Sequence, residues 1–203
     1  MRYCWLRKFE DNVASLFEQG KISAPVHLSG DNSIAIKRIF GNIHKKDYVF
    51  SNWRSHYHYL LHTGNDKGLL DEILGKETGI CKGNARSMHI IDRKHNFFSS
   101  AIVAGCVSMA VGVAWALKEK QSRRMVHIFL GDGAFDSGFT YEAVRYAQGF
   151  NLPVIFYYED NNRSVCTTKK QRWGITKITK SKVHHYYYKA RWPHCGTGKW
   201  VSL

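Results

Sequence analysis

Two hard oxygen donors, the carboxylate of Asp132 and the side-chain amide of Asn161, are separated by 29 residues, and each comes shortly after an apolar segment. Donors of this type suit Mg²⁺ or Ca²⁺, and Mg²⁺ usually completes its coordination shell with waters and substrate phosphates. The pair predicts a divalent metal that holds a phosphorylated ligand. The alternative is structural, with Asp132 capping a helix and residues 160–162 forming a turn. The occurrence of both halves at this spacing favours the metal site.

The segments around these donors predict one β-α-β unit. Residues 125–130 are apolar, partly β-branched and few, which is typical of a buried strand. Residues 139–149 carry apolar side chains at helical spacing, and residues 152–158 form a second apolar strand with its proline near the start. The two strands should be parallel, with a right-handed crossover. Since ligands of parallel α/β sheets bind beyond the carboxyl ends of strands, Asp132 and Asn161 should lie at a binding edge.

This pattern resembles the thiamine-diphosphate motif, and in particular the alpha subunit of the decarboxylase component of 2-oxo acid dehydrogenases of the pyruvate, branched-chain and acetoin types. The resemblance covers roughly residues 7–168, and the chain is short for such a subunit. It implies a doubly wound, mostly parallel α/β fold in a single domain, 1–203, that binds thiamine diphosphate and Mg²⁺. The matching residues around the motif are Gly131-Asp-Gly-Ala134, Glu142-Ala143, Leu152-Pro153 and Ile155-Phe156.

The resemblance also implies the metal ligands and the cofactor contacts. Asp132 and Asn161 match the family's Mg²⁺ ligands, and the backbone carbonyl of Arg163 would be the third protein ligand. Asp160 stands where the family usually has a first asparagine. The residues that the resemblance places against the cofactor are His27, Trp53, Arg54, Ala101, Val103, Asp132, Gly133, Ala134 and Asn161.

Several of these residues lie in recognisable local contexts. His27 stands in a Pro-Val-His-Leu segment, and Arg54 and His56 match a Tyr-Arg-x-His motif in which Trp53 replaces the tyrosine. The planar fork of arginine suits a diphosphate, and the indole N–H of tryptophan can still donate a hydrogen bond. The resemblance implies catalytic roles for His27 and His56. A loop at residues 79–89 is similar to the family's glycine-rich Ser-Met-His loop.

Other segments predict the framework. Residues 7–20 place apolar side chains on one helical face, residues 69–74 suggest a short helix, and residues 184–188 favour a strand. Residues 101–117 contain no charge and predict a buried helix; their number is at the short edge for a membrane span. We expect no membrane contact, because the next strand leads directly into the metal motif.

Composition restricts the class of protein. The chain has 203 residues, 44% of them apolar, which is enough for one compact domain with a sizeable core. Five cysteines without C-x-x-C spacing argue against a disulfide framework and a structural zinc site. No signal or transit peptide is evident, so the expected location is cytoplasmic.

A formal net charge of +14 permits several kinds of partner. Nucleic-acid binding is possible in principle, as is an aromatic and basic contact surface at residues 47–59. The bases are scattered, however, so a solvated basic face is favoured over nucleic acid, and steering of an anionic partner is a third interpretation. Basic residues gather at 169–172 and 177–182, which we expect to face an acidic lipoyl carrier.

The resemblance implies decarboxylation of a 2-oxo acid and transfer of the remaining fragment to a lipoyl carrier protein. In that family the glutamate that activates the cofactor belongs to a beta-type subunit, and this sequence shows no second domain that would supply it. The chain should therefore be catalytically incomplete alone, with its active site at a subunit interface. Two alternatives are half of a transketolase-like ketol-transfer enzyme and a non-catalytic basic binding protein on the same fold.

Overall fold

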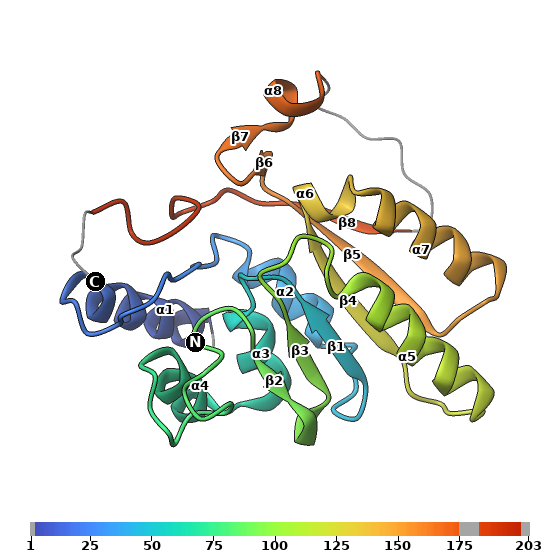
Figure 1. Cartoon of the computed structure of the whole chain (residues 1–203), viewed down its shortest axis with the longest axis horizontal. Coiled ribbons are helices and arrows are strands. Elements are labelled where there is room, and N and C mark those ends of the chain that lie inside the picture. Colours follow the sequence, from blue (N-terminus) through green and yellow to red (C-terminus); the bar gives the residue numbers. More distant parts are fainter. Residues whose placement is uncertain (1–2, 175–182, 200–203) are drawn as a thin grey trace.

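A mostly parallel sheet of six strands forms the centre of the protein, and the computed structural model describes residues 3–174 and 183–199 (Figure 1). Within the sheet, β2 is antiparallel to β3, and the other neighbouring pairs are parallel. A short ribbon of β6 and β7 lies apart from it. In spatial order the sheet contains β2 (Ile91–Asp92), β3 (Phe97–Ser99), β1 (Tyr48–Ser51), β4 (Val126–Gly131), β5 (Val154–Asp160) and β8 (His184–Tyr187), and the ribbon consists of β6 (Arg163–Ser164) and β7 (Thr167–Thr168).

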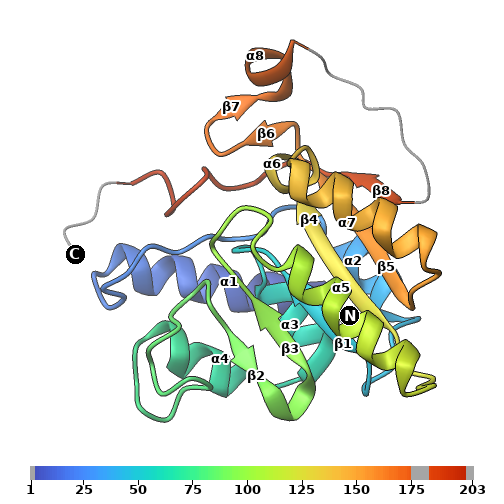
Figure 2. The same cartoon turned by 45° about the vertical axis from the view of Figure 1, so that its right-hand side comes forward.

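Helices cover both faces of this sheet. Helices α5 and α7 lie together on one face, whereas α1, α2 and α3 pack on the other (Figure 2). The predicted α/β fold class is therefore confirmed. The helices are α1 (Tyr3–Glu18), α2 (Ser33–Phe40), α3 (His56–Thr63), α4 (Asp66–Ile73), α5 (Val107–Glu119), α6 (Asp132–Phe135), α7 (Gly138–Gly149), α8 (Lys169–Trp173) and the 3₁₀ helix η1 (Arg93–His95).

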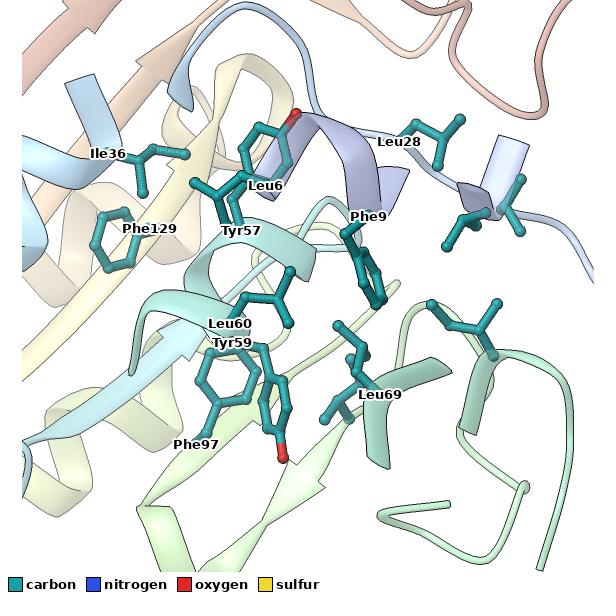
Figure 3. Close-up of a cluster of buried hydrophobic side chains, with 14 of the residues drawn as sticks. Leu6, Phe9, Leu28, Ile36, Tyr57, Tyr59, Leu60, Leu69, Phe97 and Phe129 are labelled. Carbon is teal, nitrogen blue, oxygen red and sulfur yellow. The ribbon is translucent and has the colours of Figure 1, made fainter. Parts of the chain in front are cut away.

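Two apolar cores, one on each face, hold the layers together. Alternate residues of a strand point to opposite faces, so Ile128 and Leu130 join the core under α5 and α7 while Phe129 joins the other. Figure 3 shows Phe129 near Ile36 of α2 and Tyr57 of α3. Because both faces of β4 are buried, the strand is mostly apolar rather than alternating, as is typical of central parallel strands. Its one polar side chain, His127, is buried with its ring nitrogens 3.1 Å from the Tyr157 hydroxyl and 3.2 Å from Asp47 Oδ2.

The predicted β-α-β unit is present, with small shifts at its boundaries. Strands β4 and β5 pair in parallel and place Gly131 opposite Glu159. The second strand begins at Val154, directly after Pro153, because proline cannot donate to the strand ladder. The predicted helices at 7–20 and 69–74 correspond to α1 and α4, and the predicted strand at 184–188 corresponds to β8.

The helix predicted at residues 101–117 begins six residues later than expected, at Val107. Residues 101–106 form turns, and Ala104 adopts a left-handed backbone with φ of 59°, which ends any helix running from Ala101. The helix is also not buried all round, since Ser108 and Met109 are exposed. In the described part of the chain, no helix is long and apolar enough to cross a membrane.

Candidate functional site

A cleft opens at the carboxyl edge of the sheet, where four parallel strands end. Its lining comes from the segments that follow β1, β4, β5 and β8, which converge because parallel strands end on the same edge. Six residues predicted from the sequence line it, namely Trp53, Arg54, Asp132, Gly133, Asn161 and Arg163. The remaining lining residues are Asn52, Gly131, Glu159, Ser164, Val165 and Tyr188.

Asp132 is buried at the start of α6, directly after β4. Its Oδ1 accepts a hydrogen bond from the Tyr158 hydroxyl at 3.0 Å, and its Oδ2 accepts one from the backbone N–H of Asn161 at 3.1 Å. The two predicted metal ligands are therefore in direct contact. Burial first, and the neighbouring Asp160 second, raise the pKa of Asp132 to about 7.

Asn161 is held in a turn between β5 and β6. Its Oδ1 accepts a hydrogen bond from the backbone N–H of Arg163 at 3.0 Å, and its Nδ2 donates to the Tyr188 hydroxyl at 2.9 Å. This side-chain-to-backbone bond two residues on is a local turn that asparagine favours. The bonds fix the amide beside Asp132 and bring Arg163 to the cleft wall.

The donors at this edge fit a hard divalent cation. Each oxygen of Asp132 accepts one hydrogen bond and each keeps a lone pair, and the amide oxygen of Asn161 accepts one hydrogen bond from the backbone N–H of Arg163 and also keeps a lone pair. Among the described residues, no group of three or more His, Cys, Asp or Glu side chains is arranged to hold a metal. A metal here would therefore depend on amide and carbonyl oxygens and on the phosphates of its ligand.

Arg54 is oriented by three neighbouring segments. Its backbone N–H donates to Asn52 Oδ1 at 2.8 Å, its Nε donates to the Leu28 carbonyl at 3.1 Å, and its Nη2 donates to the His194 carbonyl at 3.1 Å. A guanidinium carries five N–H donors. Arg54 is thus held at the cleft with donors left for an anionic ligand.

His27 lies beside the cleft rather than in its lining. The ring is buried, with its centroid 4.9 Å from that of His194 and 6.2 Å from that of Trp53. Burial first, then the nearby positive groups, lower the pKa of His27 to about 3, so the ring is neutral. Three buried ring nitrogens in this cluster have no hydrogen-bond partner among the described residues. They are His27 Nδ1, Trp53 Nε1 and His194 Nδ1. Buried polar groups without a partner are uncommon, and these three nitrogens are available to a polar ligand.

His56 does not line the cleft, and the catalytic role that the resemblance implies for it stays a prediction. It is fully buried, its Nε2 is 2.9 Å from Ser87 Oγ, and its Nδ1 is 3.4 Å from Glu10 Oε1. Ser87 Oγ in turn accepts the backbone N–H of His27 at 3.4 Å. His56 therefore supports the loop beneath His27, because α3, which it begins, runs into the core.

Three small predicted residues lie around the cleft without lining it. Ala101 is half-buried in the turns before α5, and Val103 is exposed there. Ala134 is buried in the core under α6. Gly133 does line the cleft, and a β-carbon at this position would lie 2.7 Å from Ser164 Oγ and 3.8 Å from Val103 Cγ1. Any larger residue at this position would therefore require the Ser164 hydroxyl to move, because β6 passes close to α6 here.

The basic segment 169–172, which the sequence led us to expect on a side facing an acidic carrier, is not exposed throughout. Lys169 is buried, and its ammonium lies 2.5 Å from Asp160 Oδ2 and 3.6 Å from Asp132 Oδ1. Its neighbour Lys170 is exposed. Nothing in a run of two lysines distinguishes the buried one, so sequence reasoning missed it. The second basic segment, 177–182, lies outside the described residues.

The chain after β8 crosses the cleft edge toward α1 (Figure 1). Backbone hydrogen bonds join it to the N-terminal loop, from Asp31 N to the Lys189 carbonyl at 3.1 Å and from Gly196 N to the Val26 carbonyl at 2.8 Å. It also supplies Tyr188 and His194 to the site. The loop-like character of this segment was predicted, but its place over the cleft was not.

Several known proteins resemble this chain in sequence. A family model described as the dehydrogenase E1 component matches residues 1–186. The chain is 37% identical over 164 residues to the alpha subunit of acetoin:2,6-dichlorophenolindophenol oxidoreductase from Bacillus subtilis, covering 80% of this chain and 49% of that subunit.

Alpha subunits of the pyruvate dehydrogenase E1 component are also similar. The one from Porphyra purpurea is 32% identical over 182 residues, covering 86% of this chain and 53% of the relative. The one from Rickettsia prowazekii is 33% identical over 164 residues, covering 80% of this chain and 50% of the relative. The chain spans about half the length of these relatives.

Proposed function

The chain belongs to the dehydrogenase E1 component family, and on this basis we propose that it is the diphosphate- and Mg²⁺-binding, alpha-type part of a thiamine-diphosphate-dependent 2-oxo acid dehydrogenase. The observation that carries the proposal is the cleft itself. A carboxylate, an amide and a guanidinium from three separate strand ends meet there, beside buried ring nitrogens without partners. This donor set suits a metal-bound diphosphate with a polar ring system attached.

Each residue has a role that follows from its chemistry. Asp132 and Asn161, with the carbonyl of Arg163, hold Mg²⁺, and Arg54 neutralises the diphosphate. The unpaired nitrogens of His27 and Trp53 donate to or accept from the polar groups of the cofactor. Thiamine diphosphate, when bound, supplies the electron sink for loss of CO₂ from a 2-oxo acid. The neutral state of His27 avoids placing another positive charge in the site.

The remaining machinery comes from partners: a beta-type subunit with the activating glutamate and a lipoyl carrier that accepts the fragment. The names of the relatives, which are alpha subunits, support this division. An exposed apolar face along α7 supports a subunit contact, because large aromatic side chains gather there in addition to the usual scattered ones. Phe139 and Tyr146 line a hollow between α7 and α5, and Phe150, directly after α7, has its ring centroid 4.6 Å from that of Tyr146.

We expect thiamine diphosphate to bind only together with a divalent metal. The Asp132 carboxylate repels a diphosphate and Arg54 offers a single positive charge, so a divalent cation held by Asp132 and Asn161 would supply the remaining attraction. Isothermal titration calorimetry with the beta-type partner present, in Mg²⁺ and then in excess EDTA, measures this dependence. Equal affinity in the two conditions would contradict the proposed site.

We also expect the purified chain alone to show no 2-oxo acid decarboxylase activity. The activating carboxylate would come from the partner, so CO₂ release should appear only after the beta-type subunit is added. A parallel assay of ketol transfer between sugar phosphates distinguishes the transketolase-like alternative from 2-oxo acid decarboxylation. Sustained turnover by the chain alone would overturn the division of the active site.

A further inference from the structure

Lys169 carries a positive charge into the interior next to the proposed metal ligands. The residue begins α8, and its side chain is 3% exposed. The helix start is fixed by a capping box in which Thr168 Oγ1 accepts the N–H of Gln171 and the Gln171 side chain accepts the N–H of Thr168. This cap directs Lys169 inward while Lys170 stays exposed.

The ammonium of Lys169 lies between two carboxylates. It contacts Asp160 Oδ2 at 2.5 Å and lies 3.6 Å from Asp132 Oδ1. The rings of Tyr158 and Tyr187 face the same ammonium, with centroids 5.7 Å and 5.6 Å from Nζ. Carboxylates and aromatic faces both attract a cation, so the surroundings compensate for the cost of burying the charge.

The two carboxylates have different surroundings. Asp160 is also bonded by His185 Nε2 at 3.0 Å and by the backbone N–H of Asn162 at 2.9 Å, and it does not line the cleft. Asp132 does line the cleft and keeps lone pairs free for a metal. Lys169 is therefore held in place by Asp160, and its ammonium lies close enough to Asp132 for the two charges to interact.

We propose that Lys169 is an internal cation that lowers and sets the divalent-metal affinity of Asp132. The inference rests on the proposed function, since it concerns the same metal position. A metal bound to Asp132 must accommodate the fixed positive charge of Lys169 a few ångströms away, and Asp160 offsets that charge. Buried charges at such separations interact strongly, because solvent screens them weakly. Lys169 is a positioning and tuning residue, and it does not touch the reacting atoms.

The test is Mn²⁺ binding, followed by the paramagnetic resonance signal of free Mn²⁺ at pH 8, in the complex with the partner subunit and saturating thiamine diphosphate. Lys169→Met should bind Mn²⁺ tighter than wild type by about tenfold or more, since it removes a close positive charge. Asp160→Asn should bind several-fold more weakly, because the unbalanced lysine then acts on Asp132 alone. The double variant Asp160→Asn/Lys169→Met should return close to wild type.

Lys170→Met is the matched control, because it removes the same charge from the exposed neighbour and should leave Mn²⁺ affinity nearly unchanged. If Lys169→Met folds and its Mn²⁺ affinity is unchanged or weaker, Lys169 has only a structural role and the inference is wrong. If Lys169→Met does not fold, the inference still requires weakening in Asp160→Asn and recovery in the double variant. Failure of wild type to bind Mn²⁺ would overturn the proposed metal site together with this inference.

Discussion

Replacing Asp132 with alanine is expected to reduce the affinity for thiamine diphosphate in Mg²⁺ by about 100-fold or more, since losing even an outer partner of a metal ligand costs about 10–100-fold. The change removes the one carboxylate of the cleft that is in direct contact with Asn161. It also leaves the diphosphate charge with less compensation, because the metal is no longer held between protein and ligand.

Titration calorimetry of the complex with its partner subunit measures this loss, and circular dichroism checks that the variant is folded. Asp136→Asn is a suitable control, because it removes a carboxylate four residues further along that does not line the cleft. Its affinity should stay near that of wild type. An unchanged affinity in Asp132→Ala would place the metal elsewhere and end the proposal for this cleft.

Replacing Glu72 with alanine is expected to lower the free energy of unfolding by about 4 kcal/mol, since hydrogen bonds to a charged group contribute about 1.5–3 kcal/mol each and do not add fully. The carboxylate is completely buried. It accepts four backbone N–H groups of the loop after α4, from Cys81 at 2.6 Å, Gly83 at 2.9 Å, Ala85 at 2.7 Å and Arg86 at 3.1 Å. Without it these donors stay buried and unpaired.

Urea denaturation monitored by fluorescence gives the change in stability. Glu77→Ala, which removes an exposed carboxylate from the same loop, should change stability by no more than about 0.5 kcal/mol. The loop carries Ser87, which accepts the N–H of His27. Glu72→Ala should therefore also weaken cofactor binding. A loss of stability no larger than that of Glu77→Ala would show that the loop is held by other contacts.

The sequence alone determined the central β-α-β unit and the meeting of Asp132 with Asn161. Both follow from local patterns: an apolar run short enough for a strand, a helical periodicity, and the rule that parallel strands end on one edge. The resemblance added Trp53, Arg54, Gly133 and Arg163, and these also line the cleft. Motif positions next to strand ends are predictable because the strand fixes where the following residues lie.

Only the tertiary structure decided the surroundings of these residues. The burial of Lys169 depends on Asp160, the last residue of β5, and the burial of His56 depends on Glu10 in α1 and on the loop that carries Ser87. None of these partners lies within one helical turn of the residue that it contacts, so none leaves a periodic signal in the sequence. The late start of α5 depends on a left-handed backbone at Ala104, and an alanine in the sequence does not predict that conformation. Local sequence sets where strands and helices form, whereas which charges become buried is set by contacts between segments far apart in the chain.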